Sequence, residues 1–231
     1  MNKIIKFWDD NLVSRHIGIE IGWLFEYLNS NNISEVSYID IGSNVGKFYD
    51  VISEKYKVNK CIMVEPSNSL FEYSSEKYSN VKEIELFNFA ISDENGEFNF
   101  SNSADMCIDY YEKNGIDESI NLGLSKINKG VVGDVKCFSM DFFLKNYNTI
   151  PNKEITFIKI DTENLDLNII KSMTQYFIDN KIKPFILFEN NYHNTMSKIE
   201  AENIINNFCN LCGYGLIDLD KPGDNFITPI K

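Results

Sequence analysis

The feature that most constrains the fold is a regular alternation of short apolar segments with amphipathic ones. Strand-like apolar segments occupy residues Ser37–Ile41, Lys60–Pro66, Lys82–Ser92, Ile155–Asp161 and Pro184–Asn190. Segments with helical spacing follow at Gly46–Glu54, Ser67–Lys77, Leu165–Phe177 and Ser197–Leu211. This alternation predicts an α/β fold, a parallel sheet with helices on both faces. The two terminal segments, Tyr214–Leu219 and Asn225–Ile230, can pair antiparallel at one edge of that sheet.

Composition bounds the class of protein. The 231 residues are 43% hydrophobic, which suits a single domain with a sizeable core spanning residues 1–231. The net charge of −12 disfavours binding to nucleic acid or to an anionic membrane surface. No apolar run approaches the roughly 20 residues of a membrane span. The first residues lack the apolar core of a signal peptide, so we expect a cytoplasmic protein.

Two segments lie outside the alternation. Residues 1–34 carry an amphipathic pattern at Ile17–Asn29, which predicts an N-terminal helical extension. Residues 102–130 have no clean periodicity and contain three glycines. We expect this second segment to be an insertion with one or two short helices that acts as a lid or a substrate-binding loop.

The five cysteines are few, odd in number and scattered. Without a secretory signal they are expected to be reduced thiols, as in a cytoplasmic protein. Cys209 and Cys212 form a lone CxxC motif without a second pair of ligands. A structural zinc site needs four ligands. We therefore interpret both cysteines as residues of a helix face.

Acidic residues stand where the predicted strands end. Asp40, Glu65, Asp161 and Glu189 each fall at the carboxyl end of a different strand. Ligands of open α/β sheets bind beyond those ends, and carboxylates are rarely buried without a partner. This edge of the sheet is therefore the predicted functional site.

The turn after the first strand, in "YIDIGSNVGKF", narrows the ligand. Glu65 stands 23 positions after Gly42, a spacing at which a carboxylate can accept both hydroxyls of a ribose. A cofactor that contains a nucleoside follows, either NAD or S-adenosylmethionine. Asn44 occupies the place where a dinucleotide turn has its middle glycine. Asp40 adds a negative charge, which disfavours a pyrophosphate and suits the ammonium and sulfonium groups of S-adenosylmethionine.

Six segments between Ser37 and Asn191 occur in the order and spacing of one known family. They are "YIDIGSNVGKF", "CIMVEPS", "FNFAISDENGEFNF", "SMDFFL", "FIKIDTENLDLNIIKSM" and "PFILFEN". With them the chain resembles the FkbM-type S-adenosylmethionine-dependent methyltransferases. The resemblance implies the class I methyltransferase fold, a Rossmann-like sheet of seven mostly parallel strands with the last antiparallel.

The resemblance also implies roles for individual residues. The first motif, which binds the cofactor, is matched by Asp40, Gly42, Asn44 and Gly46. Glu65 matches the acid that binds the ribose. Asn88 to Ser92 match the segment that lines the adenine, with a backbone contact expected at Ala90. Asp161 matches the acid near the methionine end of the cofactor and the reacting methyl group.

One segment departs from the family pattern. After an acid the family usually has Gly-Ala-Glu, where this chain has Asn164-Leu165-Asp166 after Glu163. Because asparagine tolerates a left-handed backbone, Asn164 can keep the turn. The departure bears on substrate contacts and rate more than on cofactor binding.

Methyl transfer to a hydroxyl requires a group that removes the proton of the acceptor. His193, Asp161 and Glu163 are the candidate catalytic residues, because the unperturbed pKa of a histidine suits a base near neutrality and the two acids end a strand. Asp161, Glu163 and Glu189 can also be combined as oxygen ligands for Mg²⁺ or Ca²⁺. The alternative that we adopt is that these acids orient the cofactor ammonium or cap helices, so that no metal is predicted.

The sequence therefore predicts a methyltransferase that uses S-adenosylmethionine. The resemblance to the family implies that the acceptor is a hydroxyl of a sugar, glycan or other small metabolite. Methylation of an amino group is the alternative acceptor chemistry. A catalytically degenerate scaffold that binds a partner protein is the alternative that the altered Glu163–Asp166 segment favours. A nicotinamide-dependent oxidoreductase is the third, against which the missing middle glycine argues.

Overall fold

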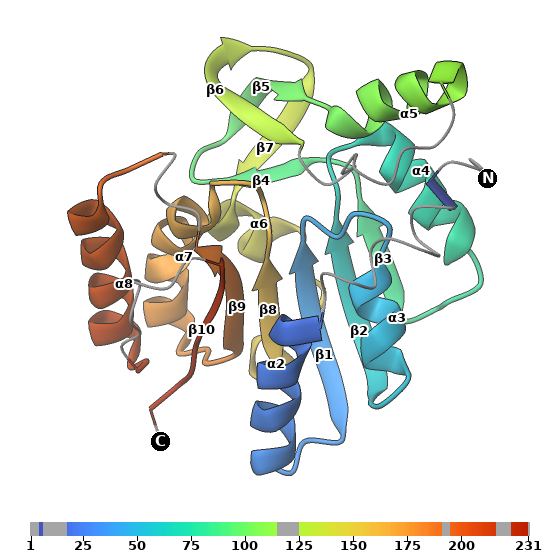
Figure 1. The fold of residues 1–231 in the computed structure, drawn as a ribbon. Helices are drawn as coiled ribbons and strands as arrows, with labels where there is room; N and C mark the ends of the chain where they lie inside the picture. Colours follow the sequence, from blue (N-terminus) through green and yellow to red (C-terminus); the bar gives the residue numbers. More distant parts are fainter. Residues whose placement is uncertain (1–4, 7–17, 115–124, 191–194, 216–222, 231) are drawn as a thin grey trace.

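The structure is a computed structural model that describes residues 5–6, 18–114, 125–190, 195–215 and 223–230. Its main sheet has the strand order β10-β9-β8-β1-β2-β3, drawn across the middle of Figure 1. These strands are β1 (Glu35–Ile41), β2 (Lys57–Val64), β3 (Ile84–Phe87), β8 (Phe157–Ile160), β9 (Phe185–Asn190) and β10 (Gly223–Ile227). Neighbouring strands pair in parallel except β10, which runs antiparallel to β9. The predicted mostly parallel sheet with an antiparallel last strand is confirmed.

The other predicted closing strand lies at the limit of the description. Most of the segment Tyr214–Leu219 falls outside the described residues. Tyr214 itself makes an isolated antiparallel bridge with Pro229. The main sheet thus contains six strands within the described residues.

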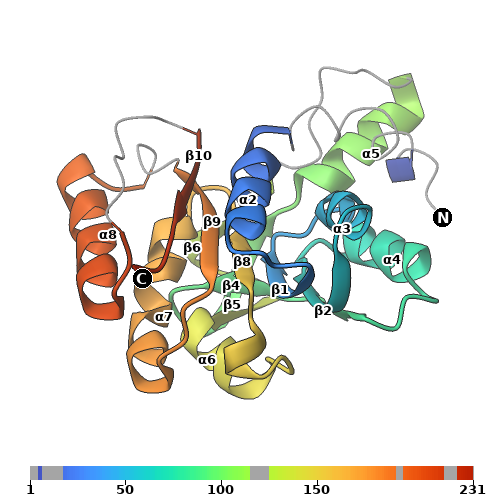
Figure 2. The same ribbon diagram turned by 90° about the horizontal axis from the view of Figure 1, so that it is seen from below.

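Helices cover both faces of the main sheet (Figure 2). They are α2 (Gly18–Ser30), α3 (Lys47–Ser53), α4 (Asn68–Lys77), α6 (Met140–Asn146), α7 (Asp166–Asn180) and α8 (Lys198–Cys212). One apolar cluster joins α6, α7 and α8 to residues such as Ile39 and Ile158, and a second joins α2 and α3 to Tyr38 and Phe157. Successive residues of a strand point to opposite faces. Buried apolar side chains on both faces of β1 and β8 therefore require the two helical layers.

The third predicted strand, Lys82–Ser92, is wrong as a single element. The chain leaves the main sheet after β3 and resumes as β4 (Ala90–Ser92) in a second sheet with the order β4-β7-β5-β6. The amide of Asn88 donates to the backbone oxygens of Glu65 and Pro66 at 3.0 and 3.3 Å. Phe89 is buried, with its ring centroid 4.9 Å from that of Phe138. These contacts redirect the chain inside an otherwise continuous apolar segment.

The second sheet lies above the carboxyl ends of the main strands in Figure 1. Its other members are β5 (Gly96–Ser101), β6 (Lys126–Val132) and β7 (Val135–Ser139). The segment 102–130 contributes α5 (Ser103–Asn114) and most of β6, so it contains a strand where only short helices were expected. Residues 115–124 of that segment lie outside the description.

The N-terminal extension contains the predicted helix, α2. The ring centroids of Trp23 in α2 and Phe226 in β10 are 5.1 Å apart, so this helix is anchored against the edge of the sheet. Among the described residues no helix is long and apolar enough to cross a membrane.

Candidate active site

The site is positioned by the point at which the strand order of the main sheet reverses. β1 pairs with β2 on one side and with β8 on the other. The chain therefore adds β2 and β3 on one side of β1 and later adds β8, β9 and β10 on the opposite side. Crevices at such points hold the ligands of open α/β sheets. The turn Gly42–Gly46 stands at the carboxyl end of β1, and Asp161 follows β8 directly.

The backbone conformation and the close packing of the turn require glycine at both Gly42 and Gly46. Gly42 and Gly46 have φ angles of 75° and 73°, in the left-handed region that favours glycine. A Cβ atom on Gly42 would lie 1.9 Å from the backbone oxygen of Asp161, and one on Gly46 would lie 2.4 Å from the ring of Tyr78. Asn44 between them also has a positive φ, 52°. The glycines therefore let β8 and Tyr78 approach the turn closely.

Glu65 links this turn to the start of α4. Its side chain is buried, and its two carboxylate oxygens accept hydrogen bonds at 2.9 Å from the backbone N–H groups of Asn44 and Ser67. Burial raises the pKa of Glu65 to about 7, although the two N–H groups oppose that shift. Since Asn88 donates to the backbone oxygen of Glu65, the structure brings Asn44, Glu65 and Asn88 together. These are three of the residues predicted to bind the cofactor.

Asp40, predicted from the sequence to bind the cofactor, is buried. Its carboxylate is fully buried, and Oδ1 lies 3.3 Å from the ammonium of Lys159 on β8. Burial raises the pKa of Asp40, while Lys159 opposes the shift. The ammonium of Lys159 also lies 3.2 Å from Oδ2 of Asp161. The charge assigned from the sequence to the cofactor ammonium is thus already paired with a protein cation.

Lys159 is the residue at this site that the sequence reasoning missed. A lysine within the apolar strand "FIKI" was the available signal, because lysine is rarely buried without a partner. Asp161, the other acid beside it, has a side chain that is 43% exposed. Asp161 is therefore the member of this group that a ligand can reach.

The turn has unused polar atoms that fit the methionine end of S-adenosylmethionine. Ser43 Oγ and Asn44 Oδ1 are buried and have no hydrogen-bond partner among the described residues. A buried polar atom without a partner is costly, so a ligand that supplies hydrogen bonds would relieve it. Together with the carboxylates of Glu65 and Asp161, these atoms match a cofactor with ribose hydroxyls, an ammonium and a carboxylate.

Acidic side chains gather on the other side of the switch point. The pKa of Glu163 is raised to about 7 by partial burial and by the charges of Glu189 and Asp161, against the opposing charge of Lys126 on β6. Lys126 belongs to the second sheet, which therefore reaches Glu163. Glu163 and Asn164 have φ angles of 51° and 79°. The left-handed backbone expected at Asn164 is confirmed, and Glu163 shares it.

Asp166 has a structural part in this arrangement. It is buried, and its Oδ1 accepts hydrogen bonds from the backbone N–H of Thr162, at 3.0 Å, and from its hydroxyl. Its Oδ2 accepts from the backbone N–H of Glu189 at 2.8 Å. The shortened acid of the altered motif thus joins the loop after β8 to the end of β9. Burial, reinforced by the charge of Asp161, raises its pKa to about 8.

Two predicted site residues are not tested by these contacts. His193 lies outside the described residues. Ala90 is buried in β4, where it pairs with Cys137 of β7, so it belongs to the second sheet rather than to the main one. The predicted backbone contact at Ala90 stays a prediction.

Among the described residues, no group of three or more His, Cys, Asp or Glu side chains is arranged to hold a metal ion. Cys209 and Cys212 lie buried on α8, as the helix-face interpretation predicted. Their thiols face the backbone oxygens of Gly215 and Thr174 at 3.1 and 3.7 Å. Burial raises the pKa of both thiols to about 11, so they are protonated near neutral pH.

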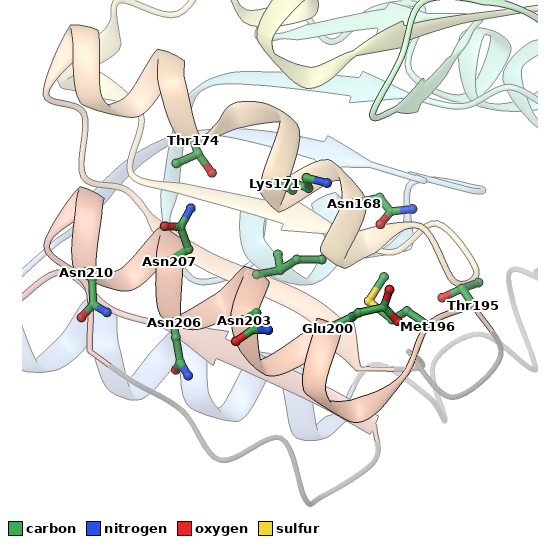
Figure 3. A pocket seen from close by; sticks show the side chains of 11 residues that line it. Asn168, Lys171, Thr174, Thr195, Met196, Glu200, Asn203, Asn206, Asn207 and Asn210 are labelled. Atoms are coloured by element: carbon green, nitrogen blue, oxygen red, sulfur yellow. The ribbon is translucent and has the colours of Figure 1, made fainter.

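A groove of about 800 Å³ lies between α7 and α8 (Figure 3). Its lining is mainly polar and includes Asn168, Asn203, Asn206, Asn207 and Asn210. It contains none of the residues predicted to bind the cofactor or to catalyse. The candidate active site is therefore located by the strand ends and their contacts, and this groove lies outside it.

Comparison with known proteins identifies the family of the chain. The family model described as the methyltransferase FkbM domain matches residues 40–216, from Asp40 to beyond α8. No curated protein matches the sequence.

Two solved structures are similar to this chain. A structure of methyltransferase FkbM from Methylobacillus flagellatus KT is 13% identical, covers 84% of this chain and has a TM-score of 0.50. The chain spans 44% of the length of that protein. A structure of a SAM-dependent methyltransferase from Aquifex aeolicus is 11% identical with a TM-score of 0.44, covering 98% of this chain and 97% of that one.

Proposed function

The chain belongs to the methyltransferase FkbM family, and we propose that it transfers a methyl group to a hydroxyl of a sugar, glycan or other small metabolite. S-adenosylmethionine is the methyl donor expected for a member of this family. The fold is the α/β fold of the class I methyltransferases. The acceptor and the atom that is methylated are the proposed part.

The proposed cofactor site follows the strand ends. Glu65 accepts the ribose hydroxyls, since each oxygen of its carboxylate keeps a lone pair beyond the one used by Asn44 or Ser67. Asn88 and Ala90 border the adenine. The turn with Gly42, Asn44 and Gly46 surrounds the methionine end together with Asp161, while the buried Asp40 supports the turn from below.

The observation that carries the hydroxyl assignment is the pKa of Glu163, which is raised to about 7. A hydroxyl acceptor must lose its proton during or after attack, and a base that titrates near neutrality serves this best. An amine acceptor needs only to be unprotonated. The bound cofactor supplies an electrophilic methyl group, and Glu163 is proposed to take the proton, with Asp161 beside it orienting the donor.

An amino acceptor is the second candidate, because a specific observation favours it. The charges of Glu189 and Asp161 both act on Glu163, which places negative charge on one side of the site. Such a group attracts a cationic amine as well as it binds a hydroxyl. His193, the remaining candidate base, follows β9 and is proposed to act only if Glu163 does not.

Labelled S-adenosylmethionine, incubated with hydroxyl and amine acceptors of sugars, tests the proposal. We expect label in an ether product, and a loss of about 10²-fold in rate for Glu163→Gln. The matched control is Glu97→Gln, which neutralises an exposed acid on β5 and should leave the rate unchanged. A full rate in Glu163→Gln together with a loss in His193→Gln would move the base to His193.

Calorimetry separates the enzyme from a binding scaffold. The wild-type chain is expected to bind S-adenosylmethionine and S-adenosylhomocysteine. Absence of heat for both ligands in a folded protein would contradict the enzyme function and favour the scaffold alternative. Label found only on nitrogen would keep the enzyme and overturn the hydroxyl assignment.

A further inference from the structure

A buried lysine lies beneath the proposed cofactor site. Lys159 and Asp40 are directly opposed in the register of β8 and β1, and both belong to the face of the sheet that α2 and α3 cover. The side chain of Lys159 is 7% exposed. A lysine at such a position carries a large desolvation cost, which its contacts must offset.

Within the described part of the chain, three oxygen atoms lie close to the ammonium of Lys159. Asp40 Oδ1 lies at 3.3 Å, Asp161 Oδ2 at 3.2 Å and the backbone oxygen of Gly42 at 3.4 Å. The ring centroid of Phe48, in the first turn of α3, is 5.7 Å from the same nitrogen. One cation therefore contacts the end of β1, the turn that follows β1 and the acid that follows β8.

The three oxygen partners differ in what they can offer a ligand. Asp40 is fully buried, so its carboxylate serves as the buried counter-ion of Lys159. The carboxylate of Asp161 is 43% exposed, and only its Oδ2 is held by the ammonium. The exposed part of that carboxylate is thereby presented in one orientation, next to the turn that the same lysine contacts.

We infer that Lys159 is a positioning residue for the methionine end of the cofactor: it orients Asp161 and holds that acid in register with the Gly42 turn. The inference rests on the proposed cofactor site and names a residue that acts in it through another. Lys159 takes no part in proton transfer. Its contribution is a fixed geometry between the two sides of the switch point, on which in-line methyl transfer depends.

The direction in which the affinity for S-adenosylmethionine changes distinguishes a positioning role of Lys159 from a role in which it only offsets negative charge. In Lys159→Met the cationic cofactor faces the carboxylates of Asp40 and Asp161 without the positive charge of Lys159 between them. If Lys159 only reduced negative charge, this variant would bind S-adenosylmethionine more tightly. If it positions Asp161, the variant binds more weakly, and we expect a loss of about tenfold or more.

The test is a double-mutant cycle measured by calorimetry with S-adenosylmethionine. Lys159→Met, Asp161→Asn and the double variant are compared with the wild type, and thermal unfolding confirms that each is folded. If Lys159 acts through Asp161, the double variant binds about as weakly as the weaker single variant. Additive losses, unchanged binding or tighter binding in Lys159→Met overturn the inference.

A companion variant covers the case in which Lys159→Met does not fold. Removing one member of a buried ion pair leaves the other charge unpaired, so Asp40→Asn/Lys159→Met removes both. We expect this variant to regain stability while its affinity stays low relative to Asp40→Asn. Equal affinity of those two proteins contradicts the inference.

The matched control is Lys60→Met, which removes another strand lysine. Lys60 lies on β2 and pairs at 2.8 Å with Glu85 on β3, the strand on the side of β2 away from β1. It should bind the cofactor like the wild type. A wild-type protein that binds no S-adenosylmethionine would refute the cofactor site itself. A wild type that binds, beside a Lys159→Met that binds equally well, refutes only the role of Lys159.

Discussion

Replacing Glu65 by glutamine tests the proposed ribose contact and the network around it. The carboxylate accepts one backbone N–H on each oxygen, from Asn44 and Ser67. A glutamine keeps one acceptor oxygen and places its NH₂ group against the other N–H. One buried donor is then left without an acceptor, which costs about 1–3 kcal/mol of unfolding free energy.

The loss in cofactor affinity is expected to exceed this structural effect. A hydrogen bond to a charged group contributes about 1.5–3 kcal/mol, so loss of one ribose contact weakens binding about ten- to hundredfold. Calorimetry with S-adenosylmethionine measures this change. Glu97→Gln is again the matched control, since that acid is exposed on β5.

The pH dependence supplies an independent signature of Glu65. Its pKa is raised to about 7 by burial, with Asp40 adding to the shift and Lys159 opposing it. If the ionised carboxylate accepts the ribose hydroxyls, cofactor affinity in the wild type falls up to about tenfold per pH unit below about 7. Glu65→Gln should lose that part of the profile.

Without cofactor, the same shift acts on stability in the opposite direction. A carboxyl whose folded pKa is raised above its unfolded value holds its proton longer in the folded protein. The unfolding free energy therefore falls as pH rises from about 4.5 to about 7, by about 3 kcal/mol for Glu65. Denaturant unfolding at several pH values measures this slope. An unchanged affinity and an unchanged pH profile in Glu65→Gln would refute the reasoning.

Four further substitutions test the stability of the turn at the site and of the surrounding fold by urea unfolding. Gly42→Ala combines a left-handed backbone with a Cβ atom 1.9 Å from a backbone oxygen, so it should destabilise by about 2–5 kcal/mol. Gly22→Ala on open helix surface should instead stabilise by about 0.5–1 kcal/mol, and similar values for the two would contradict this reading. Ser197→Ala removes the capping box of α8 and should cost about 1 kcal/mol, whereas no loss would deny the cap a role. The raised pKa of Asp166, about 8, predicts that stability falls between about pH 4 and pH 8, and Asp166→Asn should flatten that decline; an equally steep decline would place it elsewhere.

The sequence was sufficient wherever the signal is local. Apolar segments of strand length and the acids that end them placed Glu65 and Asp161 at the carboxyl edge of the sheet. The spacing of the glycine turn and the tolerance of Asn164 for a left-handed backbone were also readable, because both depend on a few consecutive residues.

Features that depend on distant contacts were not readable in this way. The segment Lys82–Ser92 has the pattern of one strand, yet the hydrogen bonds of Asn88 to the end of β2 and the packing of Phe89 divide it between two sheets. Lys126 influences Glu163 only because the second sheet returns over the main one. Neither the division of Lys82–Ser92 nor the effect of Lys126 on Glu163 can be predicted from residue spacing along the chain.

By itself the sequence determined the alternation of strands and helices, the edge of the sheet at which the candidate site lies and the identity of the acids there. Local propensity and hydrophobic period carry that information. Only the tertiary structure decided which acids a ligand can reach. Asp40 and Asp161 look alike in the sequence, but parallel pairing of β1 with β8 buries the first against Lys159 and leaves the second partly exposed. Exposure and charge pairing are set by strands that lie far apart in the chain, and that is the physical reason for the difference.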